Sequence, residues 1–298
     1  MISKLSKFYY IILIAIILFL YLIFPKTDEI FTKESYPSIE NVTATQNALQ
    51  KLKDCYNSKV FQFSNNSEDI WNNLEFIVYF CDYFENFDLR PLKNNDEIKW
   101  IVSPKNMDDN LTMVTLGIAK DITAESKLQN LLPQTDFFGA DPSNMSKVYS
   151  QIGEHFQIGV SGKSGLKSTR IYGDKRIMET QVENVNFVEF LDKYVKRKIV
   201  HFLWIDIEGG EFEIMEMLHK HEEIDTNNIT ICQINFEIHQ KVMKSLQNET
   251  EKFATFLHKI IRDEKYIIVK AFNIRHRNFV RIFLVNIEDS ECRRLFID

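Results

Sequence analysis

Two acidic residues, Asp206 and Glu208, lie at the end of a short apolar segment near the middle of the chain. Mostly apolar residues of the segment 202–207 surround Asp206, and the sequence Gly-Gly-Glu follows Glu208. An apolar run this short that ends in two glycines is typical of a buried strand. Because burying a lone carboxylate is costly, we expect both acids at the carboxyl end of this strand. In open α/β sheets, that end is where ligands bind.

A second pair of chemically useful residues, Glu237 and His239, ends the apolar segment 231–239. Residues two apart in a strand point the same way, as Asp206 and Glu208 also do. If the two strands are neighbours, the four side chains converge. They could then act as a catalytic group in which His239 is the general base for a hydroxyl. They could equally hold Mg²⁺ or a similar divalent cation. The alternative is structural: Glu208 or Glu211 caps the next helix, and His239 is an ordinary loop residue.

A candidate nucleotide site precedes these acids. Leu116, Gly117 and Ala119 follow a predicted strand, and Asp141 with Pro142 ends the next one. The 24 residues from Gly117 to Asp141 are close to the roughly 20 expected between a turn under a nucleotide and the acid that binds its ribose. A carboxylate suits that task because it accepts hydrogen bonds from both ribose hydroxyls. With one glycine in the loop, a plain strand-turn-helix remains an alternative.

Alternating strands and helices must position these residues. A parallel sheet with helices on both faces follows from that alternation, and a β-hairpin ends it. The predicted strands are 111–118, 136–140, 156–161, 200–207, 229–238, 266–272 and 279–286, and the predicted helices are 123–132 with Thr123 as N-cap, 142–153, 185–196, 212–220 and 249–262. Residues 44–87 have a mixed helical pattern, and 89–110 form a connection with at most one short strand around 100–102. Ser161–Gly165 is interpreted as a turn, and Arg275–Arg277 as solvated hairpin residues.

The chain resembles FkbM-family methyltransferases over residues 113–286. The resemblance is sharpest at Trp204–Met215, whose Ile-Asp-Ile-Glu-Gly-Gly-Glu is similar to that family's Lys-Ile-Asp-Val-Glu-Gly-Ala-Glu signature, and then at Phe138–Pro142 and Ile231–His239. It implies a Rossmann-like class I methyltransferase sheet, whose sixth and seventh strands are the terminal hairpin. It also implies S-adenosylmethionine as donor and O-methylation of a hydroxyl.

The same resemblance assigns the site residues. It makes Leu116, Gly117 and Asp141 donor contacts, with Ala119 and Pro142 beside them. Asp206, Glu208 and Glu211 mark the signature turn, and the acceptor side comprises Asp206, Glu208, Glu237 and His239, as catalytic groups or as ligands of a divalent cation.

The first 25 residues predict a membrane anchor. Phe8–Phe24 contains 17 residues without a charge, preceded by Lys4 and Lys7. The run exceeds the usual signal-peptide core of 7–15 residues or so, and no small-residue cleavage site follows it, which favours an anchor over a cleaved signal peptide. The positive-inside rule leaves the N-terminus cytosolic and the main domain in the lumen of the Golgi or endoplasmic reticulum. We therefore predict an anchor (1–25), a stem with a small helical cap (26–110) and a methyltransferase-like domain (111–298).

Cysteines and glycosylation sequons agree with a lumenal domain. Cys55 and Cys81 could form a disulfide, Cys232 is interpreted as a buried thiol within a strand, and Cys292 is unassigned. Six Asn-x-Ser/Thr sequons occur, at Asn41, Asn65, Asn110, Asn144, Asn228 and Asn248.

Composition narrows the function. A net charge of -6 with scattered lysine and arginine excludes the basic footprint of a nucleic-acid-binding protein. The favoured function is a membrane-anchored O-methyltransferase acting on a hydroxyl of a glycan or small molecule in the secretory pathway. The alternative is a catalytically silent relative that binds a glycan or protein through the same site. A glycosyltransferase is a more distant third, because Asp206-Ile-Glu208 only approximates the Asp-x-Asp metal motif.

Overall fold

A computed structural model describes residues 42–62, 66–81, 87–172, 177–240, 248–274 and 278–298. The chain divides into Met1–Glu40 and Asn41–Asp298, and the second unit is the one described below. The predicted anchor and most of the predicted stem lie outside the described residues, as do Arg275–Arg277. Among the residues that are described, no helix has the length and apolar character needed to cross a membrane.

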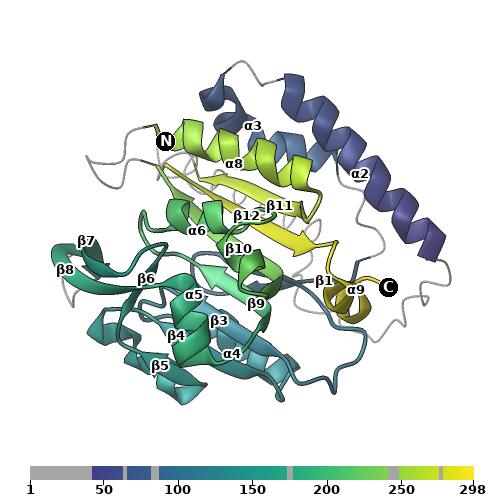
Figure 1. The fold of residues 1–298 in the computed structure, drawn as a ribbon. Coiled ribbons are helices and arrows are strands. Elements are labelled where there is room, and N and C mark those ends of the chain that lie inside the picture. The colour runs from purple at the N-terminus through teal and green to yellow at the C-terminus, as the bar shows by residue number, and fades with distance from the viewer. Residues whose placement is uncertain (1–41, 63–65, 82–86, 173–176, 241–247, 275–277) are drawn as a thin grey trace, which may run out of the picture. The chain divides into compact units, whose positions relative to one another are not determined.

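The centre of the fold is a seven-stranded sheet (Figure 1). Its strand order is β11-β12-β10-β9-β3-β4-β5, parallel from β10 to β5, while β12 runs antiparallel to both β10 and β11. The strands are β3 (Thr112–Leu116), β4 (Asp136–Ala140), β5 (Glu154–Phe156), β9 (Ile199–Ile205), β10 (Thr230–His239), β11 (Tyr266–Ile274) and β12 (Phe279–Asn286). The predicted parallel sheet with a terminal antiparallel hairpin is confirmed.

Helices cover this sheet because each has an apolar side. In α8 (Glu249–Asp263), Phe253, Phe256, Leu257 and Ile260 are buried at helical spacing, and the helix lies along β11. The other helices after β3 are α4 (Thr123–Leu131), α5 (Phe187–Phe190), the π-helical turn η2 (Leu191–Val195), α6 (Glu211–Met217), α7 (Glu223–Thr226) and α9 (Ser290–Phe296). The strands between them are buried on both sides, so their sequences are continuously apolar.

Two helices precede the sheet, as the mixed helical pattern of 44–87 predicted. They are α2 (Val42–Gln62) and α3 (Ser67–Phe80), and α3 packs on β11 and α8. Asn66 caps α3 by accepting a hydrogen bond from the Glu68 amide (2.9 Å). The predicted Cys55–Cys81 disulfide is present and links the two helices. Their apolar side chains continue the hydrophobic core of the sheet.

The segment 89–110 contains one strand more than predicted. Strands β1 (Leu89–Lys93) and β2 (Ile98–Val102) pair as an antiparallel hairpin. Pro91 argued against a strand at β1, but β1 pairs only with β2, and an edge strand tolerates a proline. The other edge of the hairpin is held by side chains of β10, which no local pattern reveals.

A second sheet was not expected. It has the order β6-β8-β7, with β6 (Gly159–Ser161), β7 (Gly165–Tyr172) and β8 (Ile177–Asn186). The single strand predicted at 156–161 is therefore wrong: β5 ends at Phe156 and β6 belongs to this other sheet. The helix predicted from 185 also starts too early, because β8 continues to Asn186, whose side chain then caps α5. Ser161–Gly165 forms the expected turn between β6 and β7.

Three local predictions also need correction. The helix predicted over 142–153 is a 3-10 helix, η1 (Asn144–Gln151). Thr123 does not cap α4; instead, the Asp121 carboxylate accepts a hydrogen bond from the Thr123 amide (3.0 Å). Cys232 is not a thiol but forms a disulfide with Cys292, 60 residues away on α9. That helix was not predicted, so the sequence offered Cys232 no partner.

Candidate active site

The register of the parallel strands brings the predicted site residues to one edge of the sheet. Ile205 of β9 lies beside Leu116 of β3 and beside Phe236 of β10. The next residues, Gly117, Asp206 and Glu237, therefore follow one another across the carboxyl ends of three adjacent strands. The expected convergence of the acids is explained by this register alone.

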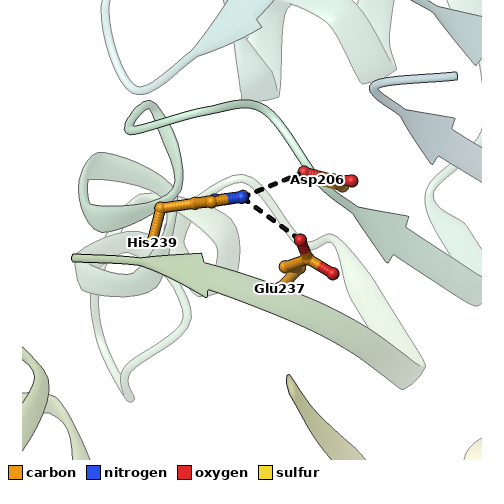
Figure 2. Close-up of side chains that lie close together, drawn as sticks. All are labelled: Asp206, Glu237 and His239. Atoms are coloured by element: carbon orange, nitrogen blue, oxygen red, sulfur yellow. Dashed lines mark ion pairs between the residues drawn. The ribbon is translucent and has the colours of Figure 1, made fainter. Parts of the chain in front are cut away.

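His239 is the centre of the acidic cluster. Its Nε2 atom lies 3.2 Å from Glu237 Oε1, 3.6 Å from Asp206 Oδ1 and 3.8 Å from Glu208 Oε1. Figure 2 shows Asp206 and Glu237 converging on the imidazole from neighbouring strands. All four residues predicted for the acceptor side are thus brought together. Three of them, Asp206, Glu237 and His239, place one potential metal-ligand atom each within 4.8 Å of one another.

Glu211 organises this cluster, although it was assigned only to the signature turn. The side chain is completely buried (0 % exposed). One carboxylate oxygen accepts hydrogen bonds from the amide (2.7 Å) and Nδ1 (3.0 Å) of His239, and the other accepts from the Gly209 amide. The alternative that Glu211 caps α6 is wrong, because α6 has no side-chain cap and this carboxylate faces the histidine.

The turn between β9 and α6 needs its glycine. Glu208 and Gly209 both have left-handed backbones, with φ of +51° and +104°. Two consecutive residues in that region are costly unless at least one is glycine. The turn directs Glu208 toward His239 and returns Glu211 beneath it. The sequence signal for Glu211 was therefore the Gly-Gly pair directly before it.

Protonation divides the cluster into an acid and a base. Both nitrogens of His239 face carboxylates, which only accept hydrogen bonds, so both carry protons. Burial disfavours this cation, but hydrogen bonds to Glu211 and Glu237 raise the pKa of His239 well above its usual value. His239 is consequently a weak general base near neutral pH.

Asp206 is the better base. Desolvation within the cluster and the charge of Glu237 raise the pKa of Asp206 well above its usual value, against the opposing effects of His239 and Lys99. For Glu237, burial acts in the same direction, yet hydrogen bonding to His239 and the charge of Arg281 lower its pKa. The Asp206 side chain is also 38 % exposed, so an incoming group can reach it.

The predicted nucleotide loop touches the acid cluster directly. Gly117 has φ of +80°, and a Cβ atom there would lie 1.7 Å from the Asp206 carbonyl oxygen. The Gly117 amide donates to the Ala140 carbonyl (3.0 Å), and the Asp206 amide donates to the Leu116 carbonyl (2.8 Å). Only glycine fits this contact. Leu116 itself is fully buried, so its part in the loop is to hold the backbone.

Asp141 clamps this loop. Its Oδ2 atom accepts from the amides of Ile118 (2.7 Å) and Ala119 (3.0 Å), and its Oδ1 atom accepts from the Ser143 amide (2.7 Å). Ala119 is held at φ +51° by this arrangement. A carboxylate has about four acceptor positions, so three are occupied. Bonds from Asp141 to both ribose hydroxyls would require a nucleotide to displace one loop amide. Pro142 follows directly and is half-buried.

Comparison with known proteins gives one family and a set of distant folds. The family model "Methyltransferase FkbM domain" matches residues 69–268. No curated protein matches the chain. Three similar solved structures are a putative rRNA methylase from Clostridium thermocellum (11% identity, TM-score 0.37, covering 61% of this chain and 90% of that one), Aeropyrum pernix fibrillarin with bound S-adenosyl-L-methionine (12%, 0.35, 60% and 68%), and the plantazolicin methyltransferase BpumL, whose organism is not part of its description, with S-adenosylhomocysteine (11%, 0.32, 82% and 98%). Likenesses this distant carry no argument about function, whereas the family match spans most of the chain.

Proposed function

Because the chain belongs to the FkbM methyltransferase family, we propose that it transfers a methyl group from S-adenosylmethionine to a hydroxyl of a glycan or small molecule. The observation that carries this proposal is the direct contact between the Gly117 loop and Asp206. A donor held over that loop would have its reactive end beside the cluster of Asp206, Glu208, Glu237 and His239. The two halves of a transfer reaction then lie at one edge of the sheet.

The reaction needs alignment and the removal of one proton. The acceptor oxygen attacks the methyl carbon in line with the departing sulfur, and the hydroxyl proton must leave as the new C–O bond forms. We assign the proton to Asp206, whose carboxyl combines partial exposure with a raised pKa. His239, clasped by Glu211 and Glu237, stays protonated and donates hydrogen bonds. The excess of carboxylates favours a neutral or basic acceptor over nucleic acid.

A divalent cation is the second candidate for this site. Two carboxylates and one imidazole suit Mg²⁺ or Mn²⁺, and their ligand atoms are within 4.8 Å of one another. A cation would have to displace the proton from His239 Nε2. Titration with Mn²⁺ tests this: saturable binding that is lost in Asp206→Asn supports a metal site, and absence of binding refutes it.

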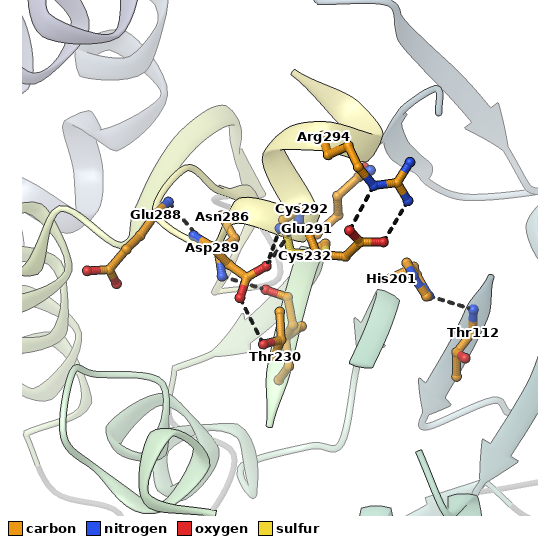
Figure 3. Close-up of a disulfide and its surroundings, with 12 residues drawn as sticks. Thr112, His201, Thr230, Cys232, Asn286, Glu288, Asp289, Glu291, Cys292 and Arg294 are labelled. Carbon is orange, nitrogen blue, oxygen red and sulfur yellow. Dashed lines mark hydrogen bonds and ion pairs between the residues drawn. A yellow bond between two sulfur atoms is a disulfide. The ribbon is translucent and has the colours of Figure 1, made fainter. Parts of the chain in front are cut away.

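The compartment proposed for the domain is the lumen of the secretory pathway, with residues 8–24 as the anchor. Two buried disulfides support it, because disulfides persist in oxidising compartments. Figure 3 shows the second of them joining β10 to α9. Asparagines of the four described sequons, Asn110, Asn144, Asn228 and Asn248, are all exposed. Loss of mass on treatment with peptide N-glycosidase, and its absence when the sequons are mutated, tests this proposal.

The catalytically silent module remains as an alternative because Asp141 is already engaged by its own loop. Calorimetric titration of S-adenosylmethionine and S-adenosylhomocysteine into the full-length protein decides between the two. Micromolar binding that is abolished in Asp141→Ala supports the methyltransferase. No binding at millimolar ligand, with a folded protein and divalent cations present, refutes it and leaves the binding module.

A further inference from the structure

Arg281 of β12 lies behind the cluster and was not predicted by any sequence pattern. It faces Glu237 across the β10–β12 pair, and its Nε atom donates to Glu237 Oε2. The other oxygen of Glu237 is the one that faces His239. The guanidinium also lies over the ring of Phe279 (5.0 Å), which contacts the His239 ring from the same strand (5.5 Å). Arg281 therefore fixes both the rotation of Glu237 and the ring on which His239 rests.

The same guanidinium holds the tip of the β1–β2 hairpin. Its Nε atom lies 3.4 Å from Glu97 Oε2, and its Nη1 atom donates to the Asp96 carbonyl (3.2 Å). Glu97 in turn receives Lys99 Nζ (2.9 Å) and the Asn94 side-chain amide (3.2 Å). Arg281 is thus the link between the hairpin tip and the acid cluster.

Charges alternate along this connection. The order is Lys99, Glu97, Arg281, Glu237 and His239, and all five side chains are at least 85 % buried. Each carboxylate lies between two cations. If the positive charge of Arg281 were removed, Glu97 and Glu237 would face each other without compensation at low dielectric, which is strongly unfavourable. We expect Glu237 to rotate away from His239 in that case.

The body of the hairpin does not depend on Arg281. The Gln233 side chain exchanges two hydrogen bonds with the Val102 backbone (2.8 and 3.0 Å), and Asn235 exchanges two with Trp100 (2.8 and 2.7 Å). These two amides replace a neighbouring strand for β2. A variant at Arg281 is therefore expected to keep the hairpin docked and to disturb only its tip and Glu237.

We infer that Arg281 is a positioning residue that holds Glu237 toward His239 and ties the β1–β2 hairpin tip to the acceptor side of the site. The inference deepens the proposed function, since it concerns the same cluster. It makes the hairpin tip a wall of the acceptor site and Glu97 its contact point.

The test uses nuclear magnetic resonance of the full-length protein labelled with ¹⁵N at its seven histidines. The two N–H protons of His239 report its two sides separately: Nδ1–H faces Glu211 on α6, and Nε2–H faces Glu237 on β10. Exchange of each proton with water is measured at one fixed pH in the natural protein, in Arg281→Met and in Arg281→Lys. Arg197→Met removes a surface arginine–aspartate pair (3.0 Å) and is the matched control.

In Arg281→Met we expect at least tenfold faster exchange of Nε2–H, with Nδ1–H changed by less than threefold. Arg281→Lys should recover most of the protection, and Arg197→Met should change neither proton. A general loss of structure would expose both protons together. Unchanged Nε2–H, or equal changes at both nitrogens, overturns the inference. Calorimetry with S-adenosylmethionine on the same samples tests the proposed function separately, because donor binding does not determine the exchange pattern.

Discussion

Replacing Gly117 by alanine tests whether the nucleotide loop and the acid cluster depend on one close contact. An alanine Cβ would lie 1.7 Å from the Asp206 carbonyl oxygen, whereas real Cβ atoms keep at least 3.0 Å, so the two backbones must separate by about 1.3 Å. That movement strains the hydrogen bonds from Gly117 to Ala140 and from Asp206 to Leu116. Losing both costs about 2 kcal/mol, and the left-handed φ of +80° adds about 1–3 kcal/mol.

Gly165→Ala is the matched control. Gly165 also has a positive φ (+127°), but a Cβ atom there meets nothing within 4 Å. It should therefore cost only the backbone term, about 1–3 kcal/mol. For a domain of this size each kcal/mol corresponds to roughly 2–4 °C in Tm. We expect Gly117→Ala to melt several degrees below Gly165→Ala in differential scanning calorimetry.

The two glycine variants should also differ in donor affinity. Displacing the loop by about 1.3 Å moves the Ile118 and Ala119 amides that Asp141 holds. We expect S-adenosylmethionine to bind at least tenfold more weakly to Gly117→Ala, about 1.4 kcal/mol, and normally to Gly165→Ala. If Gly117→Ala melts no lower than the control and binds the donor like the natural protein, the contact does not have the importance assigned to it.

Three further perturbations have defined outcomes. Glu211→Gln removes a buried charge from beside a histidine and should lower the free energy of unfolding in urea by about 2–3 kcal/mol, whereas Glu213→Gln, half-buried on the same helix, should cost under about 1 kcal/mol; equal losses would contradict the structure. Burial and Arg294 lower the pKa of His201 from 6.5 to about 4, against the opposing charges of Glu291 and Asp109. The folded pKa is thus below the unfolded one, so the stabilisation, about 3 kcal/mol, is complete above pH 6.5 and is lost as pH falls toward 4; His201→Gln should unfold without that contribution, and an unchanged pH slope would refute it. Replacing Cys232 and Cys292 together by alanine should cost about 4 kcal/mol, and detection of free thiols in the unreduced natural protein would show the bond to be absent.

The sequence determined the central sheet and the location of the site. Apolar runs ending in acids predicted β9 and β10, and parallel strands must end at a common edge, so Asp206, Glu208, Glu237 and His239 could be grouped before any coordinates. These inferences depend on local composition and on a periodicity of two, both of which a sequence displays. The second sheet and the β1–β2 hairpin were missed because their pairing partners are distant in sequence.

The roles within the site were decided by tertiary structure. That Glu211 binds His239, that Asp141 is occupied by loop amides and that Arg281 reaches both Glu237 and Glu97 all depend on contacts between elements far apart along the chain. His201 shows the same limit: its imidazole accepts a hydrogen bond from the Thr112 amide (2.8 Å; Figure 3) and is buried among its neighbours. Protonation is governed by burial and by nearby charges in three dimensions, so the sequence named the acids but could not say which of them is the base.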